Sequence, residues 1–165
     1  MSNVSHVKSK TFAANGANTT AICANQTNSG SGSMNLTNTD GVLVPGNLGT
    51  TVTIISTASD SNSGITFDVT GVGVDGSAVS QTGITGPAGT STVTTTTVFV
   101  SVTSITHSGT CTNVSCGITA TTTGTGVVFA GRTRIRGMHI KPSGTAGLID
   151  FKNTSSSGTK LLEIG

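Results

Sequence analysis

The chain has 165 residues, of which only 8% are charged and 3% aromatic, and its formal net charge is +2. This length suits one domain or two small ones. The weak net charge excludes binding of nucleic acid through a uniformly basic surface, and the absence of Trp and Tyr disfavours a carbohydrate-binding module built on aromatic platforms. Ser and Thr make up about a third of the chain, and Val, Ile and Thr recur in alternation, which favours a folded β-protein over a disordered one.

Residues 1–40 are rich in Asn, Gly, Ser and Thr, and their apolar residues keep no steady period. Two alternatives fit this composition: a disordered tail, or an extended N-terminal arm laid across a neighbouring subunit. The first residues lack the apolar run of a signal peptide, and no stretch reaches the roughly 20 apolar residues of a membrane span. We therefore expect a protein made in the cytoplasm without a signal peptide and without a membrane partner.

Residues 41–130 contain short segments in which apolar and polar residues alternate, and clusters of Gly, Ser, Asn and Asp separate these segments. This spacing predicts an all-β fold, an antiparallel β-sandwich of Ig-like or jelly-roll-like type. Asp75-Gly76 is the strongest hairpin signal. The expected strands lie within residues 41–47, 51–57, 64–74, 77–86, 91–106, 116–123 and 125–131.

The Thr-rich segment 91–106 shows the alternation most clearly. One predicted face carries Val93, Thr95 and Thr97, and the other carries Thr92, Thr94, Thr96 and Val98. Around Phe99 the segment becomes apolar on both faces. That change predicts either burial or a bend into a second sheet.

Residues 131–165 follow a predicted boundary near Gly131 and contain three expected strands, 134–141, 147–153 and 159–165. Three strands are too few for an independent domain. We expect a small C-terminal sheet that completes the sandwich or pairs with another subunit. The last strand is apolar, and an apolar edge is an aggregation hazard unless it is covered, so we expect a homo-oligomer, with a trimer favoured.

The segment "GRTRIRGMHIK", residues 131–141, holds four of the eight Lys and Arg of the chain. If it is extended, its three Arg share one face, and a bulge at Gly137 would add the following His and Lys to that face. Three alternatives remain open: a solvated face that pairs with Asp150, docking onto an acidic partner, or direct contact with nucleic acid. The last is disfavoured because no aromatics interleave. The candidate docking residues are Arg132, Arg134, Arg136, His139 and Lys141.

Cys111 and Cys116 flank a predicted loop, "TNVS", and Cys23 lies in the N-terminal segment. The loop pair is a candidate disulfide. A second alternative is that these cysteines are free thiols. A third alternative is a zinc site that includes His107, although the sequence nearby offers no fourth ligand for the metal. A protein made in the cytoplasm would keep these thiols reduced until it meets an oxidising medium. No spacing of acids, histidines or glycines indicates a catalytic site, so we predict no enzyme, no metal and no cofactor.

Residues 64–106 include "TGVGVDGSAVSQTGITGP", a Thr-rich strand and "VFVSVTSIT". This stretch resembles a β-sandwich module of virion structural proteins of tailed bacteriophages, and residues 131–165 are similar to hairpin repeats in such proteins. The resemblance implies a head decoration or cement protein that binds the assembled shell and bridges capsid subunits. Its partners would be the major capsid protein or other virion proteins, and its location the virion. A tail-associated, fibre or adaptor protein is the alternative, and a carbohydrate-binding module is less favoured.

Overall fold

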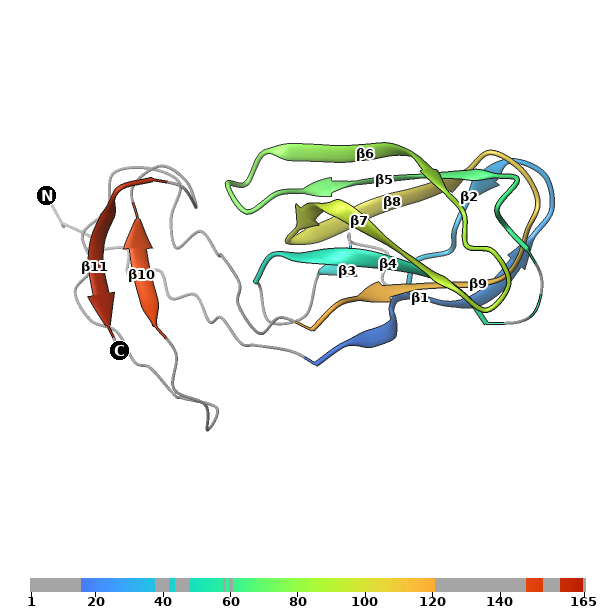
Figure 1. The fold of residues 1–165 in the computed structure, drawn as a ribbon. Helices are drawn as coiled ribbons and strands as arrows, with labels where there is room; N and C mark the ends of the chain where they lie inside the picture. Colours follow the sequence, from blue (N-terminus) through green and yellow to red (C-terminus); the bar gives the residue numbers. More distant parts are fainter. Residues whose placement is uncertain are drawn as a thin grey trace, which may run out of the picture. The chain divides into compact units, whose positions relative to one another are not determined.

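A computed structural model describes residues 16–37, 42–43, 48–57, 59, 61–120, 148–152 and 158–164. The chain divides into two compact units, Met1–Val128 and Phe129–Gly165, close to the boundary expected at Gly131. Every regular element of the described residues is a strand, and all the paired strands are antiparallel (Figure 1). The prediction of an all-β, antiparallel fold is therefore confirmed.

The first unit is a sandwich-like pair of sheets (Figure 1). In the four-stranded sheet the order is β1 (Asn18–Asn28), β9 (Cys111–Ile118), β4 (Thr50–Ser56), β7 (Thr92–Phe99). In the five-stranded sheet the order is β2 (Gly32–Ser33), β8 (Ser101–His107), β5 (Thr66–Val72), β6 (Ala78–Thr85), and β3 (Val42–Leu43) also pairs with β8.

The hairpin between β5 and β6 is the one that the Asp75-Gly76 signal predicts. The amide of Gly76 donates to the carbonyl of Gly73, and Gly76 has a φ of +82°, which glycine adopts without strain. The hydroxyl and the amide of Ser77 donate to the Asp75 carboxylate over 2.6 and 2.9 Å. These bonds hold the pKa of Asp75 below its ordinary value.

The Thr-rich segment 91–106 forms two strands in different sheets. Phe99 ends β7 opposite Thr50 in the four-stranded sheet, whereas Ser101 begins β8 opposite Val72 in the five-stranded sheet. The predicted bend into a second sheet is thus confirmed. The predicted faces are also confirmed, because Val93, Thr95 and Thr97 are buried or half-buried and the alternate residues are exposed.

The core lies between the two sheets and is made mainly of Val, Ile and Phe. Each such side chain contributes about 1.5–3 kcal/mol when it is fully buried, so stability depends on many of them. The largest fully buried side chains are Phe67, Phe99, Ile22, Ile54, Ile105, Ile118, Val52, Val69, Val102 and Val114.

The side chain of Thr95 makes hydrogen bonds to the backbone where the pairing of β4 with β7 is irregular. The pairing of β4 with β7 is irregular between Thr51 and Thr53. There the amide of Val52 donates to Thr95 Oγ1, and that hydroxyl donates to the carbonyl of Thr97, both over 2.9 Å. A buried Thr thereby satisfies backbone groups that the irregular ladder would leave without partners.

Two glutamines bind backbone groups beside edge strands. Gln81 of β6 accepts hydrogen bonds from the amides of Thr96 and Thr97 of β7, over 2.8 and 2.9 Å. Gln26 of β1 exchanges two hydrogen bonds with the backbone of Asn35, over 2.9 and 3.1 Å. Since edge strands expose groups that can recruit other chains, these amides protect two strands of the sandwich.

The expectation that residues 1–40 form an extended arm is wrong for the residues that the structure describes there. Residues 18–28 are strand β1, which pairs with β9 of the same chain. Register shifts interrupt this pairing at three places, and they explain why the sequence shows no steady apolar period. Residues 1–15 lie outside the described residues.

Gly117 allows β1 to lie close to β9. A Cβ at this position would meet the carbonyl oxygen of Asn18 at 2.0 Å and the backbone of Thr19 at 2.5 Å. No residue with a side chain fits this approach.

The second unit contains a two-stranded antiparallel sheet, β10 (Ile149–Lys152) and β11 (Lys160–Ile164). It confirms two of the three strands expected after Gly131. The third, residues 134–141, lies outside the described residues.

Candidate functional site

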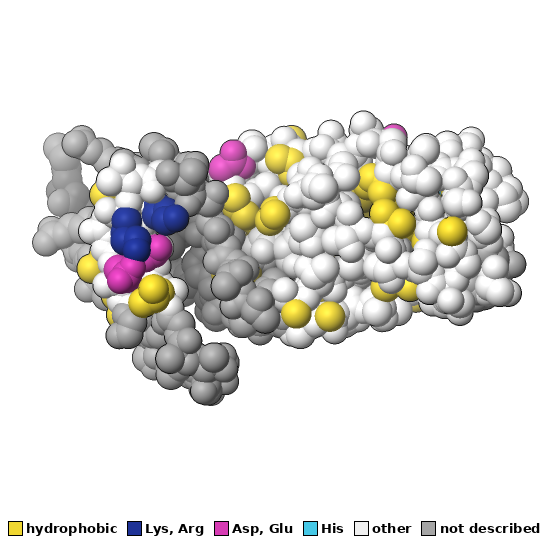
Figure 2. All heavy atoms as spheres, viewed as in Figure 1, with side chains coloured by type: hydrophobic (Ala, Val, Ile, Leu, Met, Phe, Trp, Pro, Cys, Tyr) yellow, Lys and Arg dark blue, Asp and Glu magenta, His cyan; other side chains and the backbone are white. Residues whose placement is uncertain are grey.

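The β10–β11 hairpin has one apolar face and one charged face. Residues that pair directly across an antiparallel sheet share a face. One face therefore carries the pairs Ile149–Ile164 and Phe151–Leu162. The other carries the pairs Asp150–Glu163 and Lys152–Lys160. Figure 2 shows charged side chains gathered on this unit, whereas the sandwich in the same view has mostly uncharged polar side chains and backbone at its surface.

Four large apolar side chains of the second unit are exposed. Leu148 is 69% exposed, Leu161 68%, Leu162 49% and Ile149 36%. Among the described residues of the sandwich, the large hydrophobic side chain exposed to this extent is Val98, at 39%. An exposed apolar cluster with charged residues nearby is typical of a surface that binds another protein.

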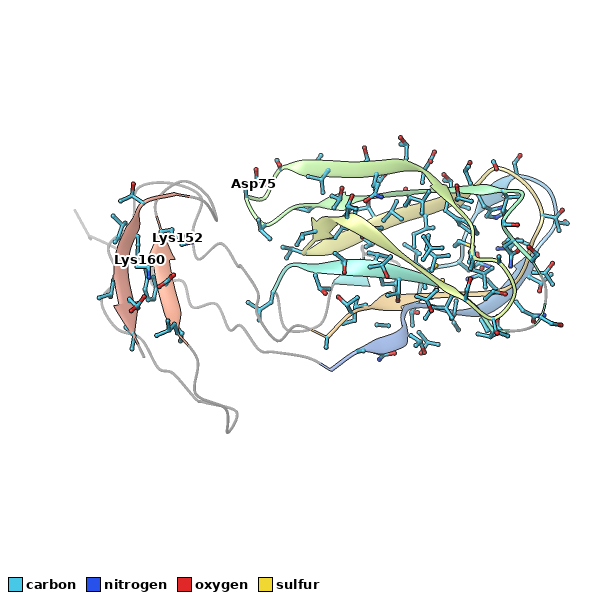
Figure 3. The ribbon with its side chains drawn as sticks, viewed as in Figure 1. Asp75, Lys152 and Lys160 are labelled. Carbon is cyan, nitrogen blue, oxygen red and sulfur yellow. The ribbon has the colours of Figure 1, made fainter. Side chains whose placement is uncertain are left out.

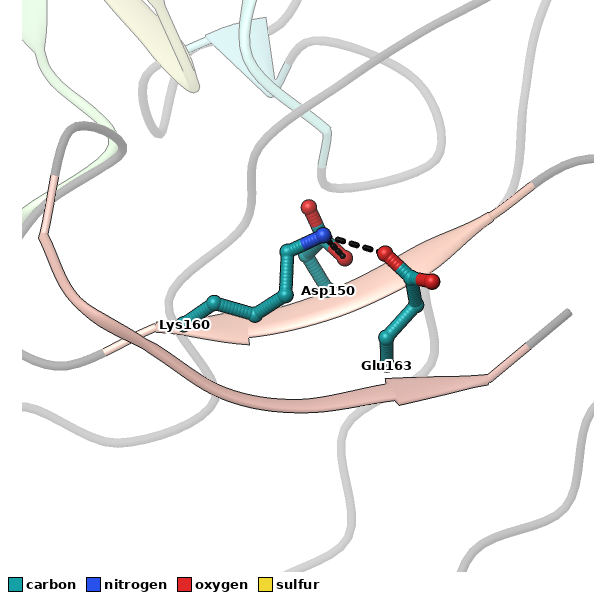
Figure 4. Close-up of polar contacts among 3 residues, drawn as sticks. All are labelled: Asp150, Lys160 and Glu163. Carbon is teal, nitrogen blue, oxygen red and sulfur yellow. Dashed lines mark hydrogen bonds and ion pairs between the residues drawn. The ribbon is translucent and has the colours of Figure 1, made fainter.

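Lys160 bridges two carboxylates on the charged face (Figure 4). Figure 3 shows Lys160 and Lys152 on the hairpin. Its Nζ lies 3.1 Å from Asp150 Oδ1 and is also hydrogen-bonded to Glu163. These two acids face each other across the strands, so they would repel without the lysine. Glu163 and then Asp150 raise the pKa of Lys160 above its ordinary value.

The predicted basic docking residues, Arg132, Arg134, Arg136, His139 and Lys141, lie outside the described residues. Pairing between that segment and Asp150 was one of the alternatives that the sequence left open. The structure gives Asp150 an ion pair with Lys160, a contact that sequence reasoning missed.

The prediction of a disulfide between Cys111 and Cys116 is wrong. The residues between them are not a loop but part of strand β9, and all three cysteines are free thiols. Five positions along one strand span about 16 Å, whereas the Cα atoms of a disulfide lie within about 7 Å. Cys111 instead contacts the sulfur of Met34 at 3.8 Å, and burial raises the pKa of Cys111.

Cys116 pairs directly with Cys23 across β9 and β1. Both are fully buried. The interaction with the Cys116 side chain lowers the pKa of Cys23, although burial opposes this effect. The interaction with the Cys23 side chain, together with burial, raises the pKa of Cys116. The sequence hides this pair because the two cysteines are far apart in the chain.

His107 is a core residue. It is 4% exposed, its ring packs at a tilt on Phe67, and its Nδ1 lies 2.7 Å from the carbonyl oxygen of Gly109. In the part of the chain that the structure describes, no group of three or more His, Cys, Asp or Glu side chains is placed to hold a metal ion. Nor do the described residues form a helix that is long and apolar enough to cross a bilayer.

Comparison with known proteins finds no family model, no curated protein and no solved structure that matches the chain. The β10–β11 hairpin has the features of a surface that could bind another protein. An amphipathic two-stranded sheet is marginal in water, and its apolar face can be buried by a partner surface.

Proposed function

We propose that this chain is a structural protein of a tailed-bacteriophage virion that acts as a capsid decoration or cement protein. The observation that carries the proposal is the concentration of exposed apolar side chains on and beside the β10–β11 hairpin, where Leu148, Leu161 and Leu162 are each about half or more exposed. The resemblance of residues 64–106 to phage β-sandwich modules supports the same function. These residues form strands β5 to β8, and we propose an Ig-like or jelly-roll-like topology for the sandwich they belong to.

In this proposal the role is structural and needs no catalysis. Many identical copies bind the assembled shell and not the free capsid subunits, so that binding stabilises the shell by mass action. Contacts from several subunits of a homo-oligomer, such as a trimer, would raise the effective affinity further.

The docking surface would combine two elements of the second unit. The first is the apolar face formed by Ile149, Phe151, Leu162 and Ile164. The second is the basic segment with Arg132, Arg134 and Arg136, which would face an acidic part of the capsid protein. Apolar burial would supply affinity, and the charges would set orientation and the salt dependence of binding.

The copy number of the chain in purified phage particles tests the location. Quantitative mass spectrometry against the major capsid protein should give hundreds of copies for a head decoration protein. A handful of copies, confined to one vertex, would contradict this proposal and favour the tail-associated alternative. Absence from the particle would reject both.

Binding of variants to shells that lack the protein tests the docking surface. Leu162→Ser should abolish co-sedimentation with the shells, because it places a hydroxyl on the apolar face. Val98→Ser, a matched change at an exposed site of the sandwich, should bind like the unmodified chain. Equal binding of both variants would exclude the hairpin as the docking element.

Two further variants separate the other candidate contacts. Changing Arg132, Arg134 and Arg136 to Ser should weaken binding and flatten its salt dependence. An unchanged salt dependence would assign these residues to a solvated face.

Deletion of an N-terminal arm should be limited to residues 1–15, because residues 18–28 belong to the sandwich. Full binding after this deletion would exclude the arm.

A further inference from the structure

Cys23 and Cys116 are placed as a cross-strand pair that the geometry of a disulfide can accept. They are direct partners in the antiparallel pairing of β1 with β9. Such partners have Cα atoms about 4.5–5.5 Å apart, which lies within the range of about 4.4–6.8 Å seen in disulfides. Each of the two thiols also shifts the pKa of the other, as expected for neighbouring groups. We propose that Cys23 and Cys116 form a disulfide when the protein meets a hydroperoxide, and that this bond locks strand β1 to the sandwich.

Access for the oxidant comes from the position of β1. Both cysteines are fully buried in the closed structure. However, β1 is the edge strand of its sheet, and its register with β9 shifts on both sides of Cys23. An edge strand with an interrupted ladder opens at a lower free energy than the central strands. Brief separation of β1 from β9 is therefore the step that admits a small oxidant.

The chemistry runs in two balanced steps. The thiolate of Cys23 attacks one oxygen of hydrogen peroxide, the O–O bond breaks, and hydroxide leaves, which gives a sulfenic acid on Cys23. The thiol of Cys116 then attacks this sulfur, the S–O bond breaks, and water leaves as the S–S bond forms. In total two thiols and one peroxide give one disulfide and two waters. Cys23 reacts first because it lies on the edge strand β1 whereas Cys116 lies on the inner strand β9, and the lowered pKa of Cys23 also favours its thiolate.

Cys111 serves as an internal control. It lies on the same strand as Cys116, but its contact is the sulfur of Met34 and its partner across the sheet is Asn28. The proposal therefore predicts that one thiol remains after mild oxidation. The bond would enclose strands β2 to β8 in one covalent loop, which restricts the unfolded chain and raises the melting temperature.

The test uses the full chain, reduced and then exposed to a small excess of hydrogen peroxide. Free thiols should fall from three to one, and mass spectrometry of the unreduced digest should find a peptide that joins Cys23 to Cys116. The oxidised protein should melt at a higher temperature than the reduced one. Cys111→Ser should behave in the same way. Cys23→Ala and Cys116→Ala should each lose both the bond and the shift, with circular dichroism of the reduced variants checking their fold.

Any of three results would overturn the proposal: a linkage that includes Cys111, a bond between two molecules, or three thiols that persist in peroxide when mild denaturant opens β1. These readouts do not involve phage particles, so their outcome is independent of the proposed function.

Discussion

Most large apolar side chains of the described sandwich are buried, whereas those of the β10–β11 hairpin are largely exposed. In the sandwich, residues such as Phe67 and Ile54 are fully buried between two sheets. In the hairpin, Leu161 and Leu162 remain more than 45% exposed, and a lysine between two acids organises the opposite face. The difference indicates that the described sandwich residues form a hydrophobic core, whereas the hairpin by itself leaves its apolar side chains accessible.

Truncation of a core side chain should lower the free energy of unfolding more than any other change considered. Phe67→Ala should lower the free energy of unfolding by about 3–5 kcal/mol, because it leaves a cavity between the sheets. Leu162→Ala, at a 49% exposed site, should change it by well under 1 kcal/mol. Chemical denaturation of the isolated protein measures both. Equal losses would mean that the hairpin is part of the stabilising core.

The next effect concerns the contact between β1 and β9. Gly117→Ala should destabilise the sandwich toward the upper end of about 1–3 kcal/mol, since the new methyl group would collide with the backbone of Asn18 and Thr19. Hydrogen exchange should show the loss of protection concentrated in β1. Gly64→Ala is the control, because a Cβ there meets nothing within 4 Å. The same stability for both variants would contradict the close approach of β1.

A smaller effect is expected from the buried hydroxyl at the β4–β7 irregularity. Thr95→Val keeps the shape of the side chain but leaves the amide of Val52 without its acceptor. We expect a loss of about 1–2 kcal/mol, as for a buried donor left unsatisfied. Thr94→Val, at the neighbouring exposed position, should have almost no effect. If Thr95→Val were neutral, the threonine would have no structural role in the bulge.

Regular alternation of buried and exposed positions made the strands from β5 to β8 predictable from the sequence. The faces of β7, and the change of sheet near Phe99, follow directly from a period of two and its interruption. Strand β1 was missed because its register shifts break that period. Residues 112–115 were mistaken for a loop for a related reason. Asn113 has a φ of 51°, which interrupts the regular strand, and every residue from Val114 to Ile118 is buried, so no alternation marks this strand in the sequence.

The candidate sites depend on pairings that a single sequence does not specify. The two strands of the hairpin were predictable, but the position of Lys160 between Asp150 and Glu163 requires a register shift after Phe151. The contact of Cys23 with Cys116 requires knowledge that residues 18–28 form a strand beside β9. Chemical reasoning from residue spacing found neither, because both depend on which strands are neighbours.

The smallest effect concerns the charged face of the hairpin, and its readout is the ionisation of Lys160. The folded protein raises the pKa of this lysine, so its ion pairs contribute fully below the unfolded pKa and are lost as the pH rises through the folded pKa. Glu163→Gln should shift the titration midpoint of Lys160 downward, because Glu163 is the larger of the two causes. The Cε signal of Lys160 in NMR measures this shift. An unshifted midpoint in Glu163→Gln would show that the ion pair is not populated in solution, and the charged face would then be solvated rather than organised by its lysine.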